Sequence, residues 1–372
     1  MSQGPATPHF PGLNSLRAYA ALFVVLGHIP LNQQSQQLPA PAPYALFYRG
    51  APAVSFFFTL SGFLITYLLL EEQRRRGAID IAAFYLRRVL RIWPLYFATI
   101  FFGLAFYNAL LPWLGIPYRV EYSIPFALLL YVFFLPNLMN SLYSVGGLLN
   151  PSWSIGIEEQ FYLAWAPVMK RWHHRLPQIA TAVLVLSLAL FTWTWANPLG
   201  LTTMQKFFEQ LKFHFMAGGA LAAYFLFTHR ERCLALPVFT RSWLQWVLGF
   251  LLVQYYFVHL IPLHPVVEEV LQIPFYAWLV VEIGANPRRR LPLENRLAEW
   301  LGTISYGIYM LHMIAVYATS YLFTKTSWWH GRPLAYVLVF YTLAVGGTIT
   351  LAAASYRFFE GPLLRLKARL AR

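Results

Sequence analysis

Cysteine and acidic side chains are the scarcest groups in this chain of 372 residues. Cys233 is the only cysteine, so no disulfide can form within the chain, and we expect an inert loop residue. Only 14 residues are acidic, and Asp80 is the only aspartate. All charged residues together make up 11% of the chain, whereas ordinary soluble domains carry about a quarter. Any glutamate inside an apolar run is therefore a candidate functional residue.

A cleavable signal peptide is also absent from the pattern. Arg17 follows a polar, proline-rich start, and no small-residue cleavage site comes after the first apolar run.

Nucleic-acid binding is disfavoured despite the net charge of +14, because the basic residues form short clusters between apolar runs rather than one face or tail. We read these clusters as signals of membrane topology.

Long apolar runs are what the chain has in abundance. Hydrophobic residues make up 58% of the sequence and aromatic residues 18%. Runs near twenty residues recur along the whole chain and predict an all-α, polytopic membrane helix bundle. The eleven candidate runs lie near 13–31, 50–71, 89–111, 123–139, 153–169, 177–196, 211–228, 242–260, 266–283, 301–323 and 334–356.

The run at 123–139 decides the topology. It is short and bracketed by Pro125 and Pro136, and every later loop would change sides if it crossed the bilayer. If it is re-entrant or interfacial and the N-terminus is inside, 22 of the 28 Lys and Arg residues lie in the cytoplasm; if it crosses, 11 do. Because cytoplasmic loops are enriched in Lys and Arg, we expect about ten transmembrane helices with both termini cytoplasmic. A re-entrant piece requires protein or a water-filled cavity around its backbone.

No second domain is visible in the pattern. We find no internal repeat and no low-complexity linker. We therefore expect one membrane-embedded domain over residues 1–372, with a core at 13–362 and a short basic cytoplasmic tail at 363–372.

The first run contains the segment LRAYAALFVVLGH, with two side chains that are energetically unfavourable in a membrane, Arg17 and His28. They are eleven residues apart, almost three full helical turns, so both project from nearly the same face. The rise between them is about 16 Å, which puts Arg17 near the cytoplasmic boundary and His28, just before the expected helix-ending Pro30, near the outer one. An anchor plus an interfacial histidine would explain the pair. A path that holds an anion at one end and moves a proton at the other would explain it too.

Further motifs favour the second interpretation. FFFTLSGFLI places Ser61 and Gly62 in the middle of the second run, and RRVLR places Arg88 and Arg91 where the third run leaves the cytoplasm, a geometry suited to phosphate. WSIGIEEQFYL and LGTISYGIYMLH add two sets of polar residues inside later runs. These are Glu158 and Glu159, near the expected depth of His28, and Ser305, Tyr309 and His312, which share one helical face.

Together these motifs, followed by YRFFEGP at 356–362, resemble the acyltransferase-3 family of integral membrane O-acyltransferases. The resemblance runs in order from about Leu13 to Pro362. It implies ten membrane helices and the transfer of an acyl group, commonly acetyl from acetyl-CoA, to a hydroxyl of a sugar or glycan. It also implies a stand-alone version without the appended esterase-like domain of some members. The resemblance further implies that the protein lies in a lipid bilayer, the bacterial cytoplasmic (inner) membrane. The implied acceptor is a glycan or a lipid-linked sugar.

The resemblance gives the candidate residues their expected roles. Arg17, Arg88 and Arg91 would bind the phosphates of coenzyme A. The only role expected of Arg74, Arg75 and Arg76 toward the donor is to attract it electrostatically. His28 would be the general base or, alternatively, a nucleophile that forms an acyl-imidazole. Glu158, preferred to Glu159 because the family pattern places its carboxylate there, would orient the imidazole. Tyr309 and His312 would position the acceptor or donate to the oxyanion, unless they only pack, and Ser61 and Glu159 would support the site.

Two other interpretations stay open at this stage. The same fold could acylate an antibiotic or another small molecule. A transporter would also place charges in the membrane, but it predicts inverted repeats and paired broken helices, and we find one broken segment. No metal is expected, because His173, His174 and His214 show no ligand spacing with carboxylates or cysteine. The acceptor, the acyl group and the oligomeric state are not encoded in any pattern we find.

Overall fold

The computed structural model describes residues 10–40, 47, 49–196, 200, 202–258 and 263–370. Within these residues every regular element is a helix and no strand occurs, which confirms the predicted all-α class. The first half of the chain forms α1 (Leu13–Ser35), α2 (Gly50–Arg76), α3 (Ile81–Ala105), η2 (Phe106–Leu110), α4 (Leu111–Trp113), α5 (Ile124–Val132), α6 (Pro136–Leu142), α7 (Ser152–Trp172), η3 (His173–Arg175) and α8 (Leu176–Ala196).

The second half begins with α9 (Thr202–Gln210), α10 (Phe213–Thr228), α11 (Arg230–Leu234), α12 (Pro237–Thr240), α13 (Ser242–Val253), η4 (Gln254–Val258) and α14 (Pro265–Ala285). It ends with α15 (Arg296–Thr303), α16 (Ser305–Thr324), α17 (Pro333–Ser355), η5 (Tyr356–Glu360) and α18 (Gly361–Leu370).

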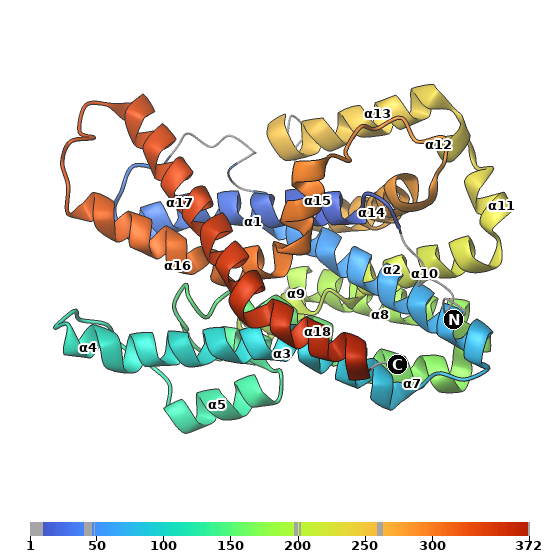
Figure 1. Cartoon of the computed structure of the whole chain (residues 1–372), viewed down its shortest axis with the longest axis horizontal. Helices are drawn as coiled ribbons and strands as arrows, with labels where there is room; N and C mark the ends of the chain where they lie inside the picture. The colour runs from blue at the N-terminus through green and yellow to red at the C-terminus, as the bar shows by residue number, and fades with distance from the viewer. Residues whose placement is uncertain are drawn as a thin grey trace.

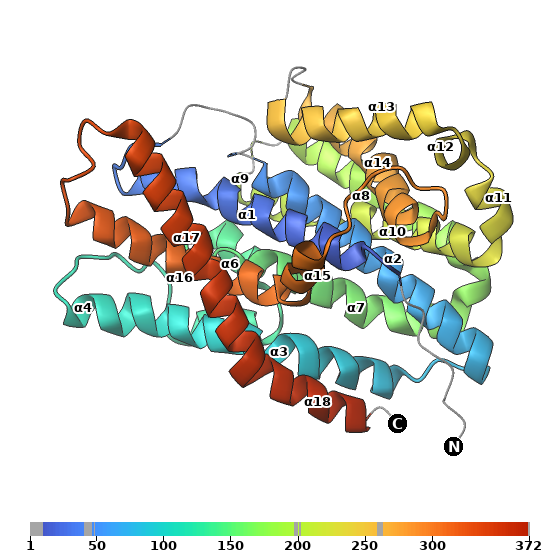
Figure 2. The ribbon, with the colours of Figure 1, turned by 45° about the horizontal axis from the view of Figure 1, so that its top comes forward.

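The helices form one bundle with α1 and α2 between its two sides. Helix α3 lies along one side, and α11, α12 and α13 line the opposite side (Figure 1). Helix α17 and its continuation into α18 cross the face of the bundle obliquely in both views (Figure 2). Helix α1 packs against α2, α15 and α16, so it lies at the centre of the fold.

Two features fix α1 in place. At its start, the backbone N–H and the hydroxyl of Ser15 both donate to Glu299 of α15, at 3.2 and 2.9 Å. Beyond Pro30 the helix continues to Ser35, so the expectation that Pro30 ends it is wrong. Proline removes only one backbone hydrogen bond from the helix. The turn after it is held by the buried side chains of Asn32 and Gln33, which are bonded to Ser320 and Tyr336.

Helices α2 and α10 approach each other backbone to backbone. A Cβ atom on Gly62 would lie 2.0 Å from the carbonyl oxygen of Met216, and one on Gly219 would lie 2.0 Å from that of Thr59. Such contact leaves no room for a side chain, and small residues are the usual means of close helix packing in membranes. Gly62 of the SGFLI motif therefore has a packing role.

Residues 123–139 do not form one continuous helix. Helix α5 ends at Val132, Phe134 has a positive φ of 55°, and α6 begins at Pro136. The nine residues of α5 span only about 14 Å, roughly half of the hydrocarbon core of a bilayer. Neither short helix is long enough to cross a membrane alone.

The predicted count of about ten spans is not confirmed. In the part of the chain that the structure describes, five helices are long and apolar enough to cross a membrane. A sixth is added if α15 and α16, which meet at 75°, count as one broken span. Helices α1 and α14 fall outside this set, and both carry polar or charged side chains within their apolar runs, which lower their mean hydropathy.

Candidate active site

A cavity of about 90 Å³ lies where α1, α2, α3, α7 and α16 meet. Six of the nine predicted site residues line it: Arg17, Ser61, Arg88, Arg91, Glu158 and Tyr309. The rest of its wall is formed by Val54, Phe57, Phe58, Ile92, Ser154, Ile155, Tyr162, Ser305 and Tyr306. Residues far apart in the sequence are thus brought to one small space with a polar end and an aromatic wall.

Three arginines give the cavity its charge. The Arg88 guanidinium lies over the rings of Phe84 and Tyr162, at 5.6 and 5.4 Å from their centroids, and Arg17 donates to Asn14 at 3.3 Å. Among the described residues, neither of them nor Arg91 forms an ion pair with a carboxylate. Arginines that form no ion pair with a carboxylate are suited to bind an anion.

The neighbouring arginines differ in this respect. Arg74 and Arg75 pair with Glu71, and Arg87 pairs with Glu72 at 3.0 Å. Each of these three guanidinium groups already contacts a carboxylate. The three cavity arginines have no such carboxylate partner among the described residues.

Glu158 lies in the cavity, at the arginine end. Its carboxylate accepts hydrogen bonds from Ser61 at 3.0 Å and from Tyr162 at 2.7 Å, and the nearby charges are those of Arg88 and Arg17. The expected hydrogen bond to His28 is not among those of the described residues. The reason is the position of α7. Its first turn, rather than Glu158, lies beside α16, where Ser154 bonds Tyr309 at 2.6 Å.

Glu159 is not among the residues that line this cavity. It is buried at 4% exposure and accepts a hydrogen bond from the indole of Trp93 at 3.0 Å, while its other oxygen has no partner within the described structure. Successive residues of a helix project about 100° apart, so Glu158 lines the cavity while Glu159 contacts Trp93 of α3.

His28 and His312 form a direct pair. His28 Nδ1 lies 2.9 Å from the carbonyl oxygen of Val24 and 3.3 Å from His312 Nε2, and the ring centroids are 4.8 Å apart. His312 is fully buried, and its Nδ1 lies 2.6 Å from the carbonyl oxygen of Tyr309. Tyr309 lines the cavity, so it connects the arginine end to the histidine pair.

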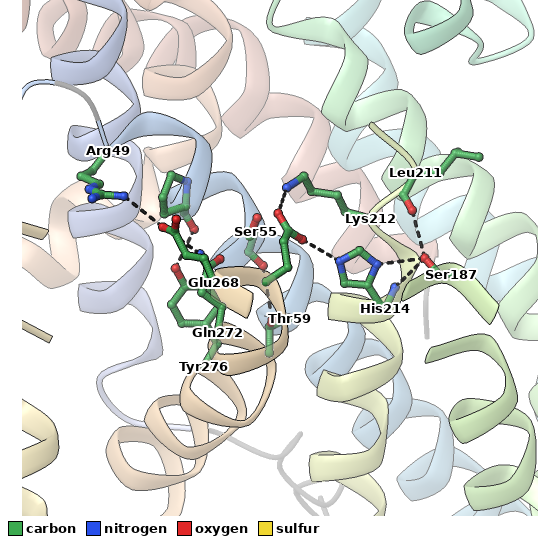
Figure 3. Close-up of polar contacts among 12 residues, drawn as sticks. Arg49, Ser55, Thr59, Ser187, Leu211, Lys212, His214, Glu268, Gln272 and Tyr276 are labelled. Atoms are coloured by element: carbon green, nitrogen blue, oxygen red, sulfur yellow. Dashed lines mark hydrogen bonds and ion pairs between the residues drawn. The ribbon is translucent and has the colours of Figure 1, made fainter. Parts of the chain in front are cut away.

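A second charged cluster was not predicted from the sequence. His214 Nε2 lies 2.7 Å from the carboxylate of Glu269, which also pairs with Lys212, and His214 Nδ1 lies 3.0 Å from the hydroxyl of Ser187. Figure 3 shows Lys212, His214 and Ser187 side by side, with Arg49 and Glu268 forming a neighbouring pair at 3.0 Å. The signal available in the sequence was the pair of glutamates inside the run 266–283.

No metal site is found in the described part of the chain, since no group of three or more His, Cys, Asp or Glu side chains converges there.

Cys233 lies in the short helix α11, and burial raises the pKa of its thiol, which keeps the thiol protonated and poorly reactive.

Comparison with known proteins identifies the family. Residues 10–356 match the family described as acyltransferase domain. The chain belongs to this family. The match includes the motifs on α1, α2, α3, α7 and α16, which are therefore parts of an acyltransferase. The predicted resemblance to the family is confirmed.

Curated relatives resemble the chain over nearly its whole length. It is 25% identical to nodulation protein 10 of Rhizobium leguminosarum bv. viciae, covering 99% of this chain and 98% of that protein. It is 24% identical to peptidoglycan O-acetyltransferase OatA of Listeria monocytogenes and 26% identical to putative peptidoglycan O-acetyltransferase YrhL of Bacillus subtilis, covering 95% of this chain in both cases. The chain spans about half the length of these two, at 56% and 55%. No solved structure matches it significantly.

These comparisons establish an O-acyltransferase enzyme, and its apolar helices make it an integral membrane protein.

Proposed function

We propose that the enzyme moves an acetyl group from cytoplasmic acetyl-CoA to a hydroxyl of a cell-envelope glycan or lipid-linked sugar. The observation that carries this proposal is the cavity that joins Arg17, Arg88 and Arg91 to Tyr309, whose carbonyl oxygen is bonded to His312 of the histidine pair. The names of the peptidoglycan relatives support acetyl as the group and a glycan as the acceptor.

The arginine end of the cavity suits the donor. Coenzyme A is a polyanion, and charge-assisted hydrogen bonds from guanidinium groups to phosphate are among the strongest polar contacts in proteins. Arg17, Arg88 and Arg91 would hold these phosphates. The pantetheine arm would then follow α1 toward His28, about 16 Å farther along the helix axis.

The histidine end supplies the proton chemistry. As a general base, His28 takes the proton of the acceptor hydroxyl while the oxygen attacks the thioester carbonyl carbon. The carbon–sulfur bond then breaks, and the proton passes to the coenzyme A thiolate. As a nucleophile, His28 would instead carry the acetyl group as an acyl-imidazole before the hydroxyl attacks. Both routes need an unprotonated ring nitrogen that faces the thioester.

Glu158 acts at the donor end in this proposal. Its hydrogen bonds from Ser61 and Tyr162 fix the cavity wall, and its charge lies near those of Arg88 and Arg17. We propose that it shapes the donor end through these two hydrogen bonds rather than by pairing with an arginine.

The membrane arrangement that fits this function has ten spans in a single domain with its core at 13–362. Both termini lie in the cytoplasm, the membrane is the inner one of a bacterium, and residues 123–139 are re-entrant or interfacial. The break between α5 and α6 supports the last point.

The test compares surface glycans from cells with and without the protein by mass spectrometry. Acetyl groups that appear only with the active protein are expected. An unchanged glycan profile, together with no transfer from labelled acetyl-CoA to isolated glycans, would overturn the proposal.

A further inference from the structure

The protons of the histidine pair can be assigned from the hydrogen-bond partners of its nitrogens. A backbone carbonyl oxygen can only accept, so the nitrogen facing it must carry the proton. His312 Nδ1 faces the carbonyl oxygen of Tyr309 at 2.6 Å, and His28 Nδ1 faces that of Val24 at 2.9 Å. Both rings are therefore protonated at Nδ1.

This assignment sets the direction of the contact between the rings. The Nε2 of neutral His312 has a lone pair and lies 3.3 Å from His28 Nδ1, which carries a proton. His28 Nδ1–H is thus shared between two acceptors, the carbonyl oxygen of Val24 and His312 Nε2. A proton on His312 Nε2 would point at the proton of His28, so His312 fits this place only when it is neutral.

The remaining nitrogen of the pair is His28 Nε2. It has no hydrogen-bond partner within the described part of the chain. Which nitrogen of a histidine is free to react is set by the bond that the other nitrogen makes. Here the other nitrogen is held from two sides.

We propose that His312 is a positioning residue that accepts the Nδ1 proton of His28 and so presents His28 Nε2 as the reacting nitrogen. This inference rests on the proposed function, in which His28 handles the proton or carries the acyl group. When His28 takes the hydroxyl proton at Nε2, its Nδ1–H stays on the two acceptors, and the Nε2 proton then leaves for the thiolate. His312 does in this site what a carboxylate does for the histidine of a catalytic triad.

The same geometry argues against an earlier expectation for His312. Both of its nitrogens are engaged, Nδ1 with the carbonyl oxygen of Tyr309 and Nε2 with His28. It has no N–H left to donate to an oxyanion or to an acceptor sugar.

The test compares His312→Gln with His312→Leu in purified protein. The amide oxygen of Gln can accept from His28 Nδ1–H, whereas Leu fills similar space and accepts nothing. We expect Leu to lower kcat about ten- to hundredfold, less than the loss of a general base itself would cost, with KM for acetyl-CoA unchanged. Gln should recover most of kcat. Equal kcat in the two variants would overturn the positioning role.

NMR of protein labelled in its ten histidines tests the assignment without any reaction. Subtracting the spectrum of His28→Gln isolates the His28 signals. We expect one neutral tautomer in the wild-type protein, with the proton on Nδ1, and a mixture in His312→Leu. A proton on Nε2 in the wild type would overturn the inference even if His312→Leu fails to fold. Loss of the proposed function is seen separately, as absence of transfer by the wild type.

Discussion

The guanidinium of Arg88 and the carboxylate of Glu158 line the same cavity, yet no ion pair joins them in the described structure. Glu158 takes its hydrogen bonds from two hydroxyl groups instead, those of Ser61 and Tyr162. The charge of Arg88 is therefore left for a ligand. If Arg88 and Glu158 formed an ion pair with each other, the cavity would offer less positive charge to an anionic donor.

Arg88→Ala and Arg91→Ala should each weaken the binding of acetyl-CoA. A hydrogen bond to a charged group is worth about 1.5–3 kcal/mol, which corresponds to a roughly ten- to hundredfold higher Kd. Lys should restore Arg poorly, because an ammonium cannot form two parallel hydrogen bonds with one phosphate. The measurement is donor affinity in detergent. Arg87→Ala is the matched control, since Arg87 is already paired with Glu72, and equal losses in all three variants would refute a specific donor site.

His28→Ala and His28→Gln should abolish acetyl transfer while leaving the binding of acetyl-CoA intact. His28 lies beyond the cavity that holds the arginines, so its loss removes the reacting nitrogen and no phosphate contact. Transfer and donor affinity are measured on the same purified samples. Full activity in either variant would remove His28 from the mechanism.

Glu158→Gln should tighten donor binding rather than weaken it. The change keeps the shape of the side chain but removes a negative charge beside Arg17 and Arg88, where phosphates would otherwise be repelled. We expect a Kd for acetyl-CoA that is lower by about two- to fivefold, which corresponds to roughly 0.4–1 kcal/mol. A higher Kd would mean that the charge of Glu158 is needed to hold the arginines in place.

Reporter fusions test the proposed topology. Fusions after Arg175 and after Arg296 should both report the cytoplasm, because positive charge is enriched on that side. An external signal at either position would mean that residues 123–139 cross the membrane despite the break between α5 and α6.

Glu269→Ala should destabilise the fold far more than Glu294→Ala. Removing Glu269 leaves Lys212 in a largely buried site without its partner, and the loss of one partner of a buried pair costs about 3–5 kcal/mol in other proteins. The pair of Arg289 with Glu294 is more exposed, and such pairs contribute at most about 1 kcal/mol. Thermal unfolding in detergent compares the two variants. Similar transitions would show that the cluster around His214 adds little to stability.

The sequence was most informative about residues that share a helix. The spacing of Arg17 from His28, and of Arg88 from Arg91, fixed their faces because helical geometry is regular. Ser61 and Tyr309 were predicted as site residues through motif resemblance, and the structure places both at the cavity.

The sequence was least informative where distances depend on how helices pack. The depth of Glu158 depends on where α7 lies against α16, which no local pattern specifies. The continuation of α1 past Pro30 depends on partners in α16 and α17, about 290 to 300 residues away. The contact of His214 with Glu269 joins side chains 55 residues apart. No helical periodicity in the sequence predicts such a contact between two helices.

The close approach of α2 and α10 limits how the enzyme can admit its donor. Ser61, in the cavity wall, is followed directly by Gly62, whose backbone lies against that of Met216. Helix α2 therefore cannot roll or slide there without a backbone clash, and it serves as a fixed wall. Any widening of the cavity for a thioester must come from its other walls, where α3 and α16 meet the cavity through side chains such as Ile92 and Tyr306.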